Sequence, residues 1–183
     1  MTAIVGVQTE LGTWFAADQQ NTFGQRKQNV NKIHRLTCGI VIANAGHTRD
    51  AQIIQYEAAP RPRHDTESDM DWLVRAFVPS VYDALKRYER DYSHSEAALS
   101  YRGKLYHLAC DLCVTPCALV IIGSGAEVMV GKLHGIDLTN PESAMITAVT
   151  AAADNTIYVN DVVDTLFDPS PYLTRNHFSP ILK

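Results

Sequence analysis

The chain has 183 residues, of which 46% are hydrophobic and 20% charged, and its formal net charge at pH 7 is −4. These values are typical of a globular protein and exclude a disordered chain, so we expect one domain over 1–183 with a tail from about 168 to 183. No basic stripe, no signal-peptide pattern and no apolar run approaching about 20 residues is present. We therefore expect a cytoplasmic protein with no nucleic-acid partner and no membrane association.

The first predicted element is a β-hairpin. Two apolar runs flank a polar stretch that ends at Gly12, a residue that suits a turn. A hairpin centre near Glu10 places Asp18 opposite Thr2, and directly opposed side chains of an antiparallel pair lie roughly 5 Å apart. The sequence therefore predicts a carboxylate beside Thr2, which becomes the N-terminal residue if Met1 is removed.

A second hairpin is predicted from the apolar segments 30–34 and 40–43, which flank a turn-like Thr-Cys-Gly. The same pairing arithmetic brings Lys32 opposite Asn44 and therefore close to Gly46. Spacing alone thus gathers a hydroxyl, a carboxylate, an ammonium and a glycine.

These four groups suit nucleophilic catalysis by an N-terminal threonine. The Thr2 hydroxyl is a weak nucleophile, but the α-amine of the same residue, with a reference pKa of about 8, can serve as its base. The Lys32 ammonium would lower the pKa of groups it touches, Asp18 would keep that lysine charged, and Gly46 lets a backbone N–H approach a substrate carbonyl. The competing interpretation is a plain strand residue under a retained Met1, beside an ordinary salt bridge.

Two helices are predicted after the hairpins. The first runs from about 49 to 57, and an exposed, proline-punctuated loop over 60–69 follows it. The second runs from about Asp71 to Tyr92, since its apolar residues recur every three or four positions, and Pro79 should kink it.

The remaining elements are taken from turn signals and caps. We expect a hairpin of 97–101 with 104–109 and a buried strand over 118–122, which together form the second sheet. Helices over 126–133 and 141–152 and a strand over 156–159 complete the chain. This order predicts an α+β protein in which two stacked sheets lie between two helical layers, a four-layer αββα sandwich.

Five segments carry a resemblance to a known family: Thr2-Ala3-Ile4-Val5, Ala16-Ala17-Asp18, Asn29-Val30-Asn31-Lys32-Ile33, Asn44-Ala45-Gly46-His47-Thr48-Arg49-Asp50-Ala51 and Ile122-Gly123-Ser124-Gly125. Their order resembles the proteasome β-subunit and HslV family of N-terminal-nucleophile hydrolases, over most of the chain. The sequence looks most like a divergent bacterial branch, the bacterial proteasome homologue (BPH). The αββα sandwich is also the fold that this resemblance implies.

The resemblance implies a threonine-type endopeptidase that cleaves polypeptides or peptides through an acyl-enzyme on Thr2. The implied catalytic residues are Thr2, Asp18, Lys32, Gly46 and Ser124. The implied substrate-binding residues are Asn21, Thr22, Val30, His34, Asn44, Thr48 and Gln52. It also implies a homo-oligomer of two stacked rings of six or seven subunits, with no cofactor, and leaves an ATPase unfoldase open as a partner.

Several alternatives stay open at this point. A noncatalytic ring subunit or a non-proteolytic amidohydrolase would share the fold. The residues His107, Cys110, Cys113 and Cys117 offer zinc-ligand chemistry at a loosely zinc-like spacing, with buried inert thiols as the alternative, and we predict no metal there. The resemblance also suggests that backbone carbonyls of Ala153, Thr156 and Val159 hold a cation.

Overall fold

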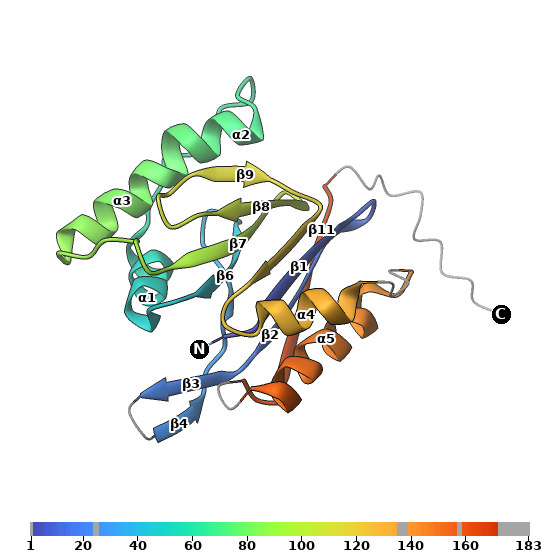
Figure 1. The fold of residues 1–183 in the computed structure, drawn as a ribbon. Helices are drawn as coiled ribbons and strands as arrows, with labels where there is room; N and C mark the ends of the chain where they lie inside the picture. Colours follow the sequence, from blue (N-terminus) through green and yellow to red (C-terminus); the bar gives the residue numbers. More distant parts are fainter. Residues whose placement is uncertain (1, 24–25, 135–138, 157–158, 172–183) are drawn as a thin grey trace.

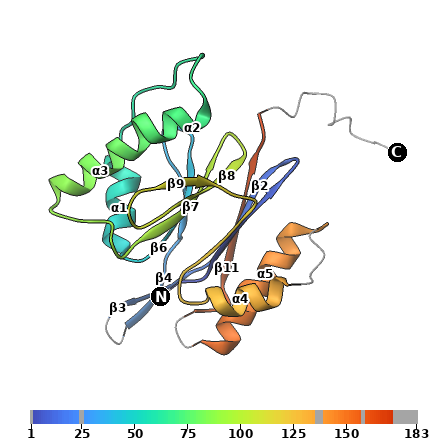
Figure 2. The ribbon, with the colours of Figure 1, turned by 45° about the horizontal axis from the view of Figure 1, so that its top comes forward.

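The computed structural model describes residues 2–23, 26–134, 139–156 and 159–171. Two antiparallel sheets lie face to face in it, and helices cover the outer face of each (Figure 1). The second view shows the same layers, with α1 to α3 on one side and α4 and α5 on the other (Figure 2). The predicted α+β fold with αββα layers is confirmed.

The first sheet contains the N-terminal hairpin at its centre. Its strands, in spatial order, are β10 (Leu119–Ile122), β1 (Ile4–Thr9), β2 (Gly12–Asp18) and β11 (Val163–Pro169). Both faces of this sheet are covered, so the apolar residues of β1 run almost without interruption instead of alternating with polar ones. The start of β1 and the end of β10 are neighbours, because the two strands are antiparallel.

The second sheet combines the second predicted hairpin with the third. Its strands, in spatial order, are β5 (Ile33–Arg35), β6 (Val41–Ala45), β7 (Glu96–Tyr101), β8 (Lys104–Leu108) and β9 (Val114–Pro116). The expectation that β10 joins this sheet was wrong. The short strand β9, which was not predicted, takes the edge beside β8, and the chain then crosses to pair with β1.

Helices flank the sheets as expected, with shifted ends. One layer holds α1 (Thr48–Glu57), α2 (Asp69–Trp72), the π-helical turn η1 (Leu73–Phe77) and α3 (Val78–Arg87). The π-helical turn directly precedes α3, where Pro79 lacks an N–H, so the predicted long helix is interrupted there, and it ends at Arg87 instead of Tyr92. The other layer holds α4 (Ala126–Leu133) and α5 (Pro141–Asn155), and no helix in the described ranges is long and apolar enough to cross a bilayer.

Buried residues form three clusters, one between each pair of adjacent layers. The cluster between the sheets contains small residues such as Ala17, Ala43 and Ala98 beside Phe15 and Leu105. Because alanines bring the backbones close, the sheets can approach tightly near Thr2. The other two clusters pack the helices onto the outer faces of the sheets.

Three segments differ from the sequence prediction. A separate ribbon, β3 (Gln20–Phe23) with β4 (Arg26–Asn29), follows β2 in a stretch for which no element was predicted. The strand β11 was missed, and its last two residues had been assigned to the C-terminal tail. The strand expected over 156–159 lies partly outside the described residues.

Candidate active site

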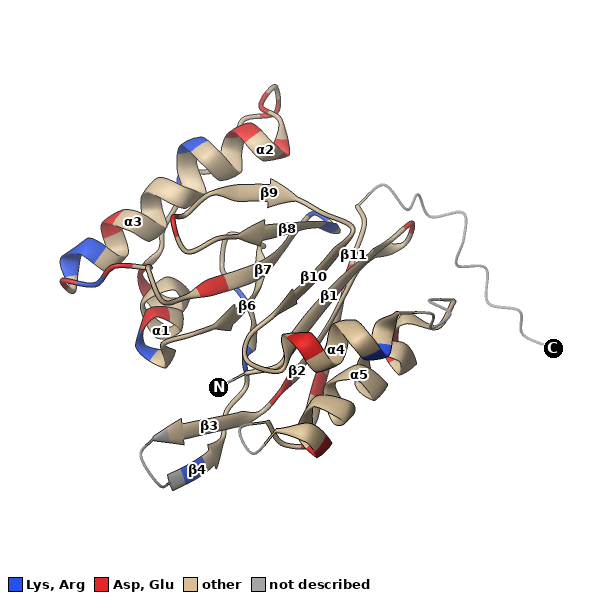
Figure 3. Ribbon diagram, viewed as in Figure 1, with Lys and Arg blue, Asp and Glu red and all other residues tan. Residues whose placement is uncertain are grey.

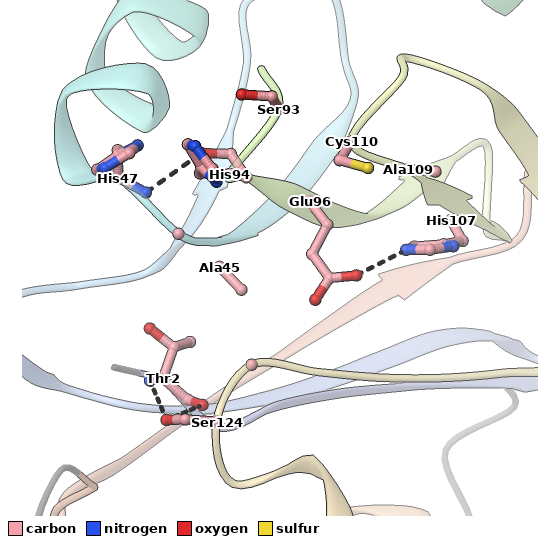
Figure 4. A pocket seen from close by; sticks show the side chains of 13 residues that line it. Thr2, Ala45, His47, Ser93, His94, Glu96, His107, Ala109, Cys110 and Ser124 are labelled. Carbon is pink, nitrogen blue, oxygen red and sulfur yellow. Dashed lines mark hydrogen bonds and ion pairs between the residues drawn. The ribbon is translucent and has the colours of Figure 1, made fainter. Parts of the chain in front are cut away.

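Thr2 lies at the floor of a cavity, just before β1 (Figure 4). Its backbone N–H donates to Ser124 Oγ at 3.2 Å, and its carbonyl oxygen accepts from the N–H of Gly125 at 3.2 Å. Gly123 has a φ of +90°, and a Cβ there would lie 2.2 Å from the Thr2 carbonyl oxygen. The turn after β10 therefore holds the backbone of Thr2, and only glycine fits at position 123.

Asp18 is fully buried at the end of β2. The β1–β2 register pairs Thr9 with Gly12 and Ile4 with Ala17, one residue away from the predicted register. Consistent with this, Asp18 Oδ1 accepts from the N–H of Ala3 at 2.7 Å, so the carboxylate holds the residue after Thr2 instead of facing Thr2 itself.

Lys32 completes the pair beneath the nucleophile. Its Nζ lies 2.7 Å from Asp18 Oδ1, and its side chain is only 8% exposed. Its carbonyl oxygen accepts from the N–H of Asn44 at 3.4 Å, which confirms the predicted pairing of these two residues. Burial lowers the pKa of the Lys32 ammonium, and the charge and hydrogen bond of Asp18 only partly offset this. The expectation that Asp18 holds the Lys32 ammonium agrees with this contact, but sequence reasoning did not include the desolvation that lowers the lysine pKa.

Gly46 follows β6 with a φ of +113°, in the region that favours glycine. A Cβ at this position would come within 2.4 Å of the His94 carbonyl oxygen and 2.6 Å of Ser95 Cα. The next N–H, of His47, donates to Ser95 Oγ at 3.2 Å. The loop at Gly46 is therefore held against the segment that leads into β7.

A second buried carboxylate supports this loop. Asp50 is fully buried and accepts from Ser95 Oγ at 2.8 Å and from Arg90 Nε at 2.8 Å. Sequence reasoning assigned Asp50 only to the first turn of a helix and missed Ser95 and Arg90. Because the partners are 40 and 45 residues away along the chain, no local pattern links them.

Two cavities meet at Thr2, and Thr2 and Gly46 line both. The smaller cavity has a volume of about 240 Å³. Its lining includes Asn21, Val30, Lys32, His34, Asn44, Thr48 and Gln52. Of the predicted substrate-binding residues, Thr22 is not among the lining, and its Oγ1 accepts from Gln20 Nε2 at 3.2 Å.

Most side chains that line the smaller cavity are polar, with Val30 and Ala51 as apolar exceptions, and no described residue of the lining is a carboxylate. Asn44 Oδ1 accepts from the Tyr92 hydroxyl at 3.3 Å, while its Nδ2 is buried without a hydrogen-bond partner among the described residues. Burial lowers the pKa of the half-buried His34, and this is partly offset by the hydrogen bond that His34 donates to the Asn31 backbone carbonyl and by the charge of Asp164. The cavity therefore offers hydrogen-bonding groups with little negative charge.

The larger cavity has a volume of about 680 Å³ and lies on the Ser124 side of Thr2 (Figure 4). A Glu96 Oε2 to His107 Nε2 contact of 3.1 Å lies in its wall.

Within the described ranges, no three His, Cys, Asp or Glu side chains gather to hold a metal ion. The zinc alternative therefore gains no support, since His107 pairs with Glu96 and Cys117 Sγ donates to the Thr115 carbonyl oxygen at 3.1 Å. The suggested carbonyl site at Ala153, Thr156 and Val159 stays a prediction.

Comparisons with known proteins identify the family and the fold. A family model described as proteasome subunit matches residues 2–164. The fold is similar to BPH from Thiobacillus denitrificans, with a TM-score of 0.76 and 19% identity over 93% of this chain and 100% of that chain. A structure of that protein in complex with epoxomicin gives a TM-score of 0.73 and 18% identity, over 92% of this chain and 98% of that chain. The fold is also similar to HslV from Trypanosoma brucei, with a TM-score of 0.64 and 19% identity over 90% of this chain and 98% of that chain. No curated protein matches the sequence.

Proposed function

The chain belongs to the proteasome subunit family, and from this premise we propose that it is a threonine-type endopeptidase subunit whose nucleophile is the Thr2 hydroxyl. The nucleophile forms once Met1 is removed, because only an N-terminal threonine carries a free amine and a hydroxyl on one residue. The observation that carries the proposal is the position of Thr2 between two cavities, with Ser124 Oγ 3.2 Å from its nitrogen.

The reaction needs only groups that surround Thr2. The Thr2 amine takes the hydroxyl proton, and the hydroxyl oxygen attacks the carbonyl carbon of the peptide bond, while the Gly46 N–H stabilises the oxyanion. The resulting ammonium gives a proton to the leaving amine as the C–N bond breaks, which leaves an ester on Thr2. Water then hydrolyses the ester, releases the acyl part as a carboxylic acid and restores the hydroxyl.

Three supporting side chains have separate roles in this proposal. Lys32, whose pKa is lowered by burial, provides a buried nitrogen that can exchange a proton close to Thr2. Asp18 holds both Lys32 and the N–H of Ala3, so it orients the start of β1. Ser124 binds the Thr2 nitrogen and keeps its position relative to the hydroxyl.

We place the acyl part of the substrate in the smaller cavity. Asn21, Val30, His34, Asn44, Thr48 and Gln52 line it, with Thr22 assigned from the family resemblance alone. The unpaired Asn44 Nδ2 and the absence of a carboxylate favour a substrate side chain that accepts hydrogen bonds over an aliphatic one. Peptide-library profiling tests this, and a pronounced leucine or isoleucine preference just before the cut would contradict it.

The proteasome-family fold implies a ring assembly, and we propose two stacked rings of six or seven copies with Thr2 facing inward. The single domain proposed over 1–183 carries no other evident gate against indiscriminate proteolysis, so unfolded polypeptides or peptides in the cytoplasm are the proposed substrates. An ATPase unfoldase is a candidate partner. Light scattering at micromolar concentration checks the assembly, and a monomeric mass would refute it.

The activity is tested with epoxomicin, a peptide α′,β′-epoxyketone that can bond both the hydroxyl and the amine of an N-terminal threonine. Intact mass spectrometry first establishes whether Met1 is absent. The treated protein should then gain one inhibitor mass, mapped to Thr2 in a ring that contains both groups. Thr2→Ala should show neither adduct nor turnover, whereas Thr2→Ser should keep some of each because it retains both groups.

The same experiment separates the alternatives. A retained Met1 without any adduct identifies a noncatalytic subunit, because the amine is then part of a peptide bond. An adduct on a cysteine would refute the threonine mechanism. An adduct on Thr2 without cleavage of any peptide, but with hydrolysis of small amides, would favour a non-proteolytic amidohydrolase.

A further inference from the structure

Glu96 occupies an unusual position for a charged residue. It begins β7 directly opposite Ala45, so the two side chains share a face of the sheet, and Ala43, Ala45 and Ala98 on that face are buried between the sheets. Alternation along the strand predicts an apolar residue there. Glu96 is instead the only charged residue of β7, which gives that strand its red segment in Figure 3. Its side chain projects with Ala45 into the larger cavity (Figure 4).

The larger cavity lies on the side from which a leaving amine would depart. The proposed mechanism returns a proton to that amine from the Thr2 nitrogen, and this nitrogen is bound to Ser124, which lines the larger cavity and not the smaller one. Both cavities share Thr2 and Gly46, where the cleaved carbonyl would bind. A substrate that crosses this point therefore has its acyl part in one cavity and its leaving part in the other.

The two cavities differ in their charged groups. Among the described residues, the larger one is lined by a single carboxylate, Glu96, by three histidines and by no lysine or arginine, whereas the smaller one is lined by Lys32, which pairs with the buried Asp18, and by no carboxylate. Glu96 Oε2 is held by His107 at 3.1 Å, which fixes the direction of a side chain that is still 38% exposed. A cation in the larger cavity would therefore meet an oriented carboxylate that the cavity itself does not neutralise with Lys or Arg.

We propose that Glu96 makes the larger cavity a subsite for a basic side chain, so that peptides with lysine or arginine directly after the cleaved bond are preferred. The proposal rests on the proposed threonine peptidase function and adds the selection of the leaving part. His107 is a positioning residue in it, because it orients Glu96. The volume of about 680 Å³ leaves room for a long side chain.

The test uses three internally quenched peptides that differ only in the residue after the cut, which is lysine, glutamine or glutamate. Cleavage at pH 8 is followed by fluorescence, and mass spectrometry verifies the cut site. We expect kcat/KM for the lysine peptide to exceed that for the glutamate peptide by about 10-fold, since a partly exposed ion pair is worth about 3-fold and its reversal adds a similar factor.

Variants of Glu96 identify the residue responsible. Glu96→Gln has nearly the same shape and should reduce the lysine-to-glutamate ratio to about one, while Glu96→Lys should invert it. Each ratio is taken within one variant, so a change in overall activity cancels. The matched control is Glu10→Gln, which removes a carboxylate at the exposed β1–β2 turn and should leave the ratio unchanged.

The outcomes separate this proposal from the function on which it rests. Equal rates for the three wild-type peptides, or an unchanged ratio in Glu96→Gln, would overturn the subsite while leaving the peptidase function intact. If no peptide is cleaved and epoxomicin does not label Thr2, both proposals fail. A ratio that collapses only in Glu96→Gln supports the subsite.

Discussion

Asp18 and Asp50 are two fully buried carboxylates that support opposite sides of the candidate active site. Asp18 binds the backbone beside Thr2 and pairs with Lys32, while Asp50 holds the loop at Gly46 through Ser95 and pairs with Arg90. Each buried carboxylate therefore accepts hydrogen bonds that hold the backbone near the candidate site in place.

The cations that pair with them differ in what they can do. The Lys32 side chain is 8% exposed, and burial lowers its pKa, whereas the Arg90 side chain is 34% exposed, and its hydrogen bond to Asp50 raises its pKa. A lysine whose pKa is lowered releases its proton more readily than a free lysine, whereas an arginine stays protonated. We therefore propose that the first pair serves chemistry as well as structure and that the second pair serves structure alone.

The largest expected effect comes from removing each cation in turn. Lys32→Met should lower kcat/KM for peptide cleavage by about 10²- to 10⁴-fold, the usual range for loss of an acid–base group. Arg90→Met, the matched control, should lower it by less than about 10-fold, because Arg90 acts only through the loop. Circular dichroism establishes that both variants fold. Similar losses in the two folded variants would break the distinction between the pairs.

The next effect concerns stability. Asp50→Ala should reduce the free energy of unfolding by about 3 kcal/mol, since it leaves a buried network without its central acceptor. Glu57→Ala removes the carboxylate of a more exposed ion pair with Arg87, so it should cost about 0.5 kcal/mol or less. Urea denaturation measures both. A loss for Asp50→Ala no larger than for Glu57→Ala would show that Asp50 does not hold the loop.

A smaller effect is expected in the alkaline dependence of stability. The pKa of Lys32 in the folded chain is lower than the ordinary lysine value of 10.5, so between the two values the unfolded chain binds more protons. The free energy of unfolding should therefore rise with pH through this window, and the contribution is lost as pH falls through the folded pKa. Urea denaturation from pH 8 to 10.5 should show this rise in the wild type but not in Lys32→Met. If the free energy of unfolding changed with pH by the same amount in both proteins, burial would not lower the pKa of Lys32.

The smallest effect is the same linkage at His34, whose pKa burial also lowers but which is only half-buried. Because the folded chain protonates His34 less readily than the unfolded chain, the free energy of unfolding should fall as pH drops below the ordinary histidine value of 6.5. His34→Gln should therefore lose less stability than the wild type between pH 7.5 and pH 5. Thermal melts at pH 7.5 and pH 5 measure the loss of stability in each protein. A larger loss in the variant than in the wild type would contradict the lowered pKa of His34.

The sequence by itself determined the layered fold and the order of most of its elements, and it supplied the five residues proposed for catalysis, of which Ser124 rests on the family resemblance alone. The elements depend on signals that act over a few residues: the Asn140 cap of α5, whose side chain accepts from the N–H of Ser143, and the turns at Gly39 and Gly103. The pairing of Lys32 with Asn44 also follows from one short turn. Local chemistry constrains such features before the chain packs.

Only the tertiary structure decided how distant segments meet. A shift of one residue in the turn changes the register of the whole hairpin, and this is why Asp18 faces Ala3 instead of Thr2. The sequence patterns of the strands also do not predict that β10 pairs with β1 or that β11 pairs with β2. The ion pair of Asp50 with Arg90 and the position of Glu96 in the wall of the larger cavity depend on contacts between distant segments, so no local spacing predicts them. The pKa of Lys32 depends likewise on burial, because desolvation is a property of the packed protein and not of the sequence around the lysine.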